Sequence, residues 1–307
     1  MVLKIKKHIV SVSLVLVALS SYAQQDPQYT QYMYNTNNVN PAYAGSREAL
    51  SIFGLYRTQW VGLDGAPDTG VFSIHSPVGE RVGLGLTFVN DRISISDEST
   101  ISIDFSYTIP LSDRYKLGFG LKTTAHLLNV DYSKLNLHDQ GDIAMSNINN
   151  KFSPNIGAGI YLYSDKFYVG FSAPNILETE HYNNDDVQSL ASERIHSYLI
   201  SGYVFDLTEG IKFKPAVLAK MVEGSPLQAD ITGNFLFNEK FVLGVAWRWS
   251  EAISGLAGFQ INDNWFIGYA YDAETTKLAN YNSGSHEIFL RYEFFNKSKR
   301  MVSPRFF

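Results

Sequence analysis

The chain of 307 residues contains no cysteine. This absence excludes disulfide bonds, cysteine-ligated zinc or iron–sulfur sites, a thiol nucleophile and the lipid-modified cysteine of a lipoprotein. The formal net charge is −5, and no cluster of lysine and arginine offers a surface for nucleic acid, so we expect no nucleic-acid partner. Beyond Ala23 no run of about 18 apolar residues occurs, which excludes a helical membrane bundle.

Residues 1–23 have the features of a secretory signal peptide. Three lysines form a positively charged start, and the stretch 9–19 is apolar. Ser21 and Ala23 supply the small side chains that precede a cleavage site. The apolar stretch is too short for a membrane-spanning helix, which needs about 20 residues. We therefore predict export with cleavage near Ala23–Gln24, which removes positive charge only and leaves a more acidic mature chain.

Strict alternation of apolar with polar or small residues recurs along the mature chain. Ile101, Ile103 and Phe105, for example, alternate with Ser102 and Asp104. Successive side chains of a β-strand point to opposite faces, so each such segment has one apolar and one polar face. Fourteen segments follow this pattern: 48–60, 69–77, 81–91, 99–110, 114–128, 154–163, 166–173, 195–206, 210–222, 227–238, 240–250, 252–262, 264–272 and 285–295.

The connections between these segments differ in length on the two sides. Tight links rich in Gly, Pro, Asn and Asp follow most even-numbered segments. Longer links follow most odd-numbered ones: 61–68, 92–98, 129–153, 174–194 and 273–284. Outer-membrane barrels have short periplasmic turns and long extracellular loops. We therefore predict an all-β fold, a transmembrane up-and-down antiparallel β-barrel of about 14 strands over residues 48–295, with both termini in the periplasm.

The aromatic residues and the glycines fit this barrel. Of the 19 tyrosines, 20 phenylalanines and 4 tryptophans, many lie near strand ends, where rings are favoured at the lipid headgroups. We assign Tyr161, Tyr163, Trp247 and Trp249, among others, to such girdles. Pairs of glycines at i and i+2 lie opposite the apolar face: 83 and 85, 118 and 120, and 157 and 159. We favour barrel curvature as their role, with the close approach of a plug as the alternative.

Two other classes of protein are less consistent with the chain. A secreted β-sandwich has the same alternation, but it explains neither the pattern of connections nor the aromatic girdles. A hydrolase needs converging nucleophile and base, and no nucleophile motif occurs; His126 or His196 with Ser197 is the one combination left open. His138 and His181 lie near acidic residues in long loops, where solvated loops are favoured over a metal site. We predict no catalytic residue, metal or cofactor.

Two stretches near the start of the mature chain carry a family resemblance. Residues 25–35 read QDPQYTQYMYN, and residues 39–46 read VNPAYAGS. They are followed by YRTQW at 56–60 and FSIHSP at 72–77. Together with the final residues KRMVSPRFF, at 299–307, this run resembles the PorP/SprF family of type IX secretion outer-membrane proteins of Bacteroidota. The resemblance spans the whole chain in register.

The resemblance implies a function that composition and periodicity do not. Members of the family are outer-membrane barrels that work with the type IX secretion system. PorP-like members are system components, and SprF-like members serve one large secreted protein, such as a gliding adhesin. The resemblance thus implies a non-enzymatic protein that binds the type B C-terminal domain of such a cargo and supports its export or surface attachment. The expected partners are this cargo, other type IX components, the lipid bilayer and lipopolysaccharide; a porin-like channel is the alternative.

The segments that flank the barrel are the first candidates for partner contact. We expect residues 24–47 to form a periplasmic N-terminal arm, with a plug in the lumen and a cap on the barrel as alternatives. The tail 296–307 is basic and is expected in the periplasm. The loops 129–153 and 174–194 are the expected outward recognition surfaces, since loops on a rigid scaffold carry specificity. The candidate partner-binding residues are Tyr29, Tyr32, Tyr34, Tyr43, Arg57, Trp60, Asp142, Asp185, Asp186 and Arg305.

Overall fold

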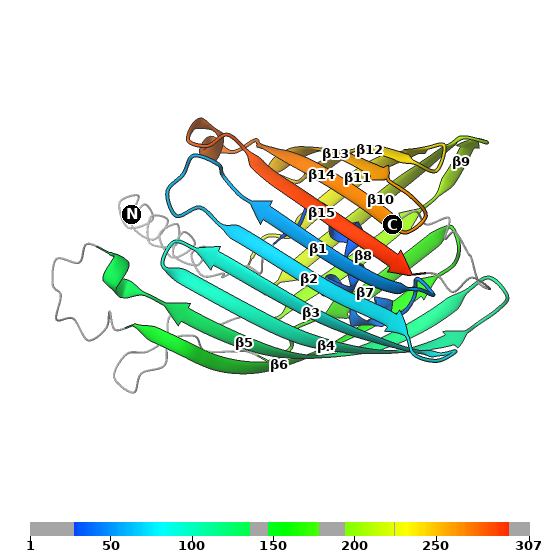
Figure 1. The fold of residues 1–307 in the computed structure, drawn as a ribbon, viewed down its shortest axis with the longest axis horizontal. Helices are drawn as coiled ribbons and strands as arrows, with labels where there is room; N and C mark the ends of the chain where they lie inside the picture. Colours follow the sequence, from blue (N-terminus) through cyan, green and yellow to red (C-terminus); the bar gives the residue numbers. More distant parts are fainter. Residues whose placement is uncertain (1–27, 136–146, 178–193, 224, 295–307) are drawn as a thin grey trace, which may run out of the picture.

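A closed antiparallel β-barrel forms the body of the protein (Figure 1). The computed structural model describes residues 28–135, 147–177, 194–223 and 225–294. The first strand, β1 (Leu50–Thr58), pairs with the last, β15 (Ser285–Phe294), and so joins the two ends of the sheet. Among the described residues no helix is long and apolar enough to cross a membrane.

The strands follow one another around the wall in chain order. Between β1 and the middle of the chain lie β2 (Asp68–Pro77), β3 (Val82–Ile93), β4 (Ser96–Pro110), β5 (Lys116–Val130), β6 (Ile148–Tyr163) and β7 (Phe167–Ala173). The other half contains β8 (His196–Tyr203), β9 (Phe205–Thr208), β10 (Ile211–Val222), β11 (Gln228–Phe237), β12 (Phe241–Arg248), β13 (Ala252–Gln260) and β14 (Trp265–Glu274). β8 and β9 both pair with β10 and are one wall strand interrupted at Val204. The prediction of 14 strands is thereby confirmed.

The two ends of the barrel differ in their connections. We call the end with the links after β2, β4, β6, β9, β11 and β13 the turn end, and the opposite end the loop end. The longest connections, 131–147 and 174–195, lie at the loop end. The expected long link at 92–98 is wrong: Ile93 pairs with Ser96, and a two-residue turn joins them with Ser94 at a φ of 54°. The polar residues of 92–98 continue β3 and β4, and those on one face of the sheet point into the lumen. In the sequence, such a polar stretch resembles a loop.

Apolar side chains cover the outer face of the wall, and polar ones line much of the inside. On β12, Leu243 and Val245 are 55% and 65% exposed on the outer face, whereas Arg248 points inward and is buried. Lipid solvates such an outer face. Trp247 and Trp249 lie on it as predicted, 45% and 60% exposed. The assignment of Tyr161 and Tyr163 to a girdle is wrong, because both rings point inward and are 2% and 5% exposed.

The segment that precedes β1 lies inside the barrel. Residues 28–46, here called the plug segment, form three short turns: η1 (Tyr32–Tyr34), α2 (Thr36–Val39) and η2 (Pro41–Tyr43), seen in blue within the ring of strands (Figure 1). Asn37 and Ala42 are both 0% exposed. The expected periplasmic arm therefore does not describe these residues; the alternative of a plug in the lumen does. The segment lacks any period because it packs on a surrounding wall rather than on one face.

Glycines of the wall make room for the plug segment. A Cβ atom on Gly120 of β5 would lie 2.1 Å from the backbone nitrogen of Ala42, and one on Gly83 of β3 would lie 2.2 Å from the carbonyl oxygen of Ala44. Atoms cannot approach this closely, so only glycine fits at either position. Curvature alone is thus the wrong account of these glycines, and close approach of the plug explains them.

Candidate functional site

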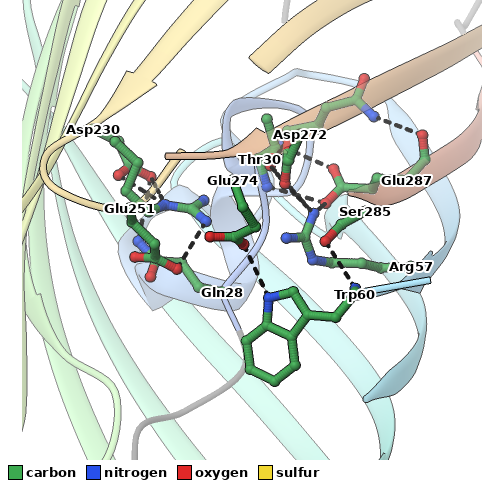
Figure 2. Close-up of polar contacts among 12 residues, drawn as sticks. Gln28, Thr30, Arg57, Trp60, Asp230, Glu251, Asp272, Glu274, Ser285 and Glu287 are labelled. Atoms are coloured by element: carbon green, nitrogen blue, oxygen red, sulfur yellow. Dashed lines mark hydrogen bonds and ion pairs between the residues drawn. The ribbon is translucent and has the colours of Figure 1, made fainter. Parts of the chain in front are cut away.

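One arginine of the wall holds the first residues of the plug segment. The Arg57 Nη1 atom lies 2.7 Å from Asp272 and 3.2 Å from Glu287, and it donates a hydrogen bond of 3.2 Å to the Thr30 hydroxyl (Figure 2). The Thr30 hydroxyl in turn donates to Asp272 at 2.7 Å. The Glu287 carboxylate accepts the backbone N–H groups of Thr30 and Gln31 at 3.0 and 2.8 Å. We call Arg57, Asp272, Glu287 and Thr30 the clamp.

The clamp is buried, and its three charged members come from three adjacent strands. Arg57 lies on β1, Glu287 is its register partner on β15, and Asp272 lies on β14. The side chains of Arg57 and Asp272 are each 2% exposed and that of Glu287 is 0% exposed. Buried charges are stable only when paired and hydrogen-bonded. Arg57 pairs with both carboxylates, and Thr30 and Gln31 add the hydrogen bonds that join the plug segment to them.

More polar contacts surround the clamp toward the loop end. The Trp60 indole N–H donates to Glu274 at 2.9 Å, beside the clamp (Figure 2). The Gln28 amide donates to Asp230 at 3.3 Å, and the same carboxylate accepts a hydrogen bond of 3.1 Å from Arg248. Gln28 thus extends the contact of the plug segment from β14 and β15 to β11.

Further along, the plug segment is hydrogen-bonded to the adjacent strands β4 to β7. Asn37 donates to Asp104 of β4 at 2.7 Å, and Asp104 forms an ion pair of 3.1 Å with Lys122 of β5. On β7, which follows β5 and β6 in the wall, the Ser172 hydroxyl donates to the Val39 carbonyl at 2.8 Å. The Asn40 amide donates to the Ile160 carbonyl of β6 at 3.0 Å. The clamp on β14, β15 and β1 and these contacts on β4 to β7 hold the plug segment at two separate parts of the wall.

Toward the turn end the plug segment and the residues just after it contact aromatic and charged side chains of the wall. The Tyr43 ring meets the rings of His75 and Tyr161 edge-on, with both centroid separations 5.6 Å. Arg47, just before β1, donates to Glu293 of β15 at 2.9 Å.

A cavity of about 200 Å³ remains between the plug segment and the wall. Its plug side is formed by Tyr29, Tyr32 and Val39, and the wall side comes mainly from β3, β4 and β5. Lys122 lies in this wall. Inward carboxylates at Asp91 and Glu98 also line it.

The sequence-predicted partner-binding residues fall into three groups. Tyr29, Tyr32, Tyr34 and Tyr43 are buried in the lumen, which makes them internal contacts of the plug segment. Arg57 and Trp60 lie together beside the first residues of the plug (Figure 2). The remaining four lie outside the described residues: Asp142, Asp185, Asp186 and Arg305. The signal peptide 1–23 and the tail 296–307 also lie outside them.

The sequence does not single out the acidic members of the clamp. Asp272 and Glu287 lie at polar positions of the alternation, where any lumen-facing residue is expected. Only the register of β1 with β15 places Glu287 opposite Arg57. His126 and His196, the two histidines that a hydrolase could use, are buried inside the barrel, 5% and 1% exposed.

Loss of the clamp arginine should destabilise the barrel strongly. In the variant Arg57→Ala, Asp272 and Glu287 remain buried without their cation, which costs on the order of 3–5 kcal/mol in the free energy of unfolding. The measurement is urea unfolding of the purified barrel in detergent. The control is Arg92→Ala, since Arg92 pairs with Asp97 but has a side chain 65% exposed, and such pairs contribute about 0–1 kcal/mol. Equal losses in the two variants would contradict the role of the clamp.

The closed wall, its apolar outer face and its polar lumen define an outer-membrane β-barrel. The chain belongs to the family described as type IX secretion system membrane protein PorP/SprF, whose family model matches residues 21–292. This confirms the resemblance found in the sequence. The family and the barrel fold together place the protein in the outer membrane, as a membrane protein of type IX secretion.

Solved structures with the same fold are outer-membrane proteins of low sequence identity. The outer membrane protein Omp33 of Acinetobacter baumannii is 7% identical, with a TM-score of 0.50 over 80% of this chain and 98% of that one. The monoaromatic hydrocarbon channel CymD is 13% identical, with a TM-score of 0.51 over 87% and 94% of the two chains. Both likenesses concern the fold alone. A search of curated proteins found no match.

Proposed function

We propose that this barrel is a non-enzymatic component of type IX secretion that binds the type B C-terminal domain of a large secreted protein, such as a gliding adhesin. It supports export of that cargo or its attachment to the cell surface. One observation supports the proposal beyond the family: the plug segment occupies the lumen, and its Asn37 and Ala42 are fully buried. A barrel filled in this way suits a rigid docking platform better than a passage for solutes.

The loop end is the surface that we assign to the cargo. By the barrel rule of short periplasmic turns, this end faces outward, and the longest connections lie there. The turn end faces the periplasm, where other type IX components are the natural partners. The outer wall contacts the bilayer and the lipopolysaccharide. Acidic residues of the long loops, among them Asp142, Asp185 and Asp186, favour a cargo surface with basic residues.

Deletion of the gene gives the decisive result for this proposal. We expect the deletion strain to lose one or more large secreted proteins from its surface, measured by quantitative proteomics of the surface and the medium. Loss of a single adhesin indicates a dedicated cargo partner, and loss of all type IX cargo indicates a core component. The control is the same strain complemented with the full chain. An unchanged set of surface proteins, together with a large open conductance of the purified barrel, would instead identify a porin-like channel.

A further inference from the structure

The cavity beside the plug segment contains an unusual pair of acidic side chains. Asp91 on β3 and Glu98 on β4 are direct register partners, so they lie opposite each other on neighbouring strands. Both point into the cavity. Like charges directly opposite in an antiparallel pair destabilise the sheet. A cation placed between the two carboxylates would offset this repulsion.

Among the described residues, one hydroxyl and one histidine contact the pair directly. Asp91 accepts a hydrogen bond of 2.6 Å from the Thr69 hydroxyl, and Glu98 lies 2.9 Å from the Nδ1 atom of His126. No lysine or arginine within the described ranges forms an ion pair with either carboxylate. In the same register row, Leu128 of β5 separates Glu98 from Lys151 of β6. Lys122, which lines the cavity, is paired with Asp104 at 3.1 Å.

The rest of the cavity suits the stem of a long side chain. Apolar and aromatic groups from several elements line the same cavity: Tyr29 and Val39 of the plug segment, Val89, Leu128, Tyr198 and Leu218. The volume of about 200 Å³ is room for one large side chain rather than for a whole domain. Lysine and arginine combine an apolar stem with a charged head, so both the walls and the pair are complemented by one residue.

We infer that this cavity is the receptor for a lysine or arginine side chain that the cargo inserts from the loop end, with its cation between Asp91 and Glu98. The inference rests on the proposed function and specifies it, because it assigns the docking point within the outward surface. The plug segment then has a second role besides filling the lumen, because Tyr29 and Val39 form one wall of the receptor.

The test uses the full barrel in detergent and the purified C-terminal domain of a secreted protein lost from the deletion strain. We expect the double variant Asp91→Asn, Glu98→Gln to weaken binding by about tenfold or more, because the attraction between the inserted cation and the two carboxylates is lost. The matched control is Glu80→Gln, Asp113→Asn, which removes the same charge from exposed turns at the other end. Faster migration of unboiled than of boiled protein in a gel verifies that each variant is folded.

The outcomes separate this inference from the proposed function. Equal affinity of the double variant and the wild type overturns the receptor and leaves the proposed function standing. Failure of the wild-type barrel to bind the domain overturns both. Loss of wild-type binding in EDTA assigns the acidic pair to a divalent cation and overturns the side-chain receptor. Substitution of each lysine and arginine of the domain by glutamine should identify one residue whose loss has no further effect in the double variant.

Discussion

Deletion of residues 28–46 should convert the plugged barrel into an ion-conducting pore. The wall closes through strand pairs that do not involve the plug segment, including β1 with β15 and β10 with β11, so the deleted chain retains its complete sheet. The plug, in contrast, fills the lumen with side chains from Tyr32 to Tyr43 that are almost entirely buried. We expect conductance in planar bilayers to rise by roughly an order of magnitude, since wide barrels without a plug enclose an aqueous channel.

The control for this deletion is to add the deleted segment back as a peptide and to measure the conductance again. A synthetic peptide of residues 28–46, added to the deleted barrel, should lower the conductance again through the Arg57 clamp and the Asn37 contact with Asp104. A peptide of the same composition in scrambled order should leave the pore open. A folded deletion variant whose conductance equals that of the full chain would show that the plug segment does not close the lumen.

The wall of the barrel could be predicted from the sequence because its two faces meet different solvents. Lipid outside and polar groups inside impose a period of two, and this period marks every wall strand. It misplaces the link at 92–98, because polar residues such as Ser96 and Glu98 continue β4 and line the cavity. Alternation alone cannot tell a polar strand extension from a polar loop.

The interior could be predicted only in part, because its contacts join distant parts of the chain. Arg57 meets Glu287 only after the barrel closes on itself, and no local pattern contains that register. The glycines illustrate the same limit. The alternation identifies Gly83 and Gly120 as inward positions without side chains, but it does not show that both lie against the plug segment near Ala42 and Ala44. Which part of the chain occupies the space beside such a glycine is decided only when the lumen is assembled.

A single methyl group on the wall should displace the plug segment. In the variant Gly120→Ala, the new Cβ atom would lie 2.1 Å from the Ala42 nitrogen and 2.4 Å from the Pro41 carbonyl carbon. Both are backbone atoms, so no change of side-chain rotamer relieves the overlap, and the strand and the plug must separate. Overpacking of this kind costs about 1–3 kcal/mol or more. We expect lower stability to urea, faster protease cleavage within the plug, and a raised conductance.

The chain offers a control with the same chemical change. Gly54→Ala adds a methyl group to β1 at a position where no heavy atom lies within 4 Å. Its effect on unfolding should stay within about 0.5 kcal/mol, and the pore should remain closed. The difference between the two variants then measures the contact between β5 and the turn η2 rather than any general intolerance of alanine in a strand. If both variants kept the wild-type stability and conductance, the plug would not be seated against Gly120, and the deletion result would need another cause.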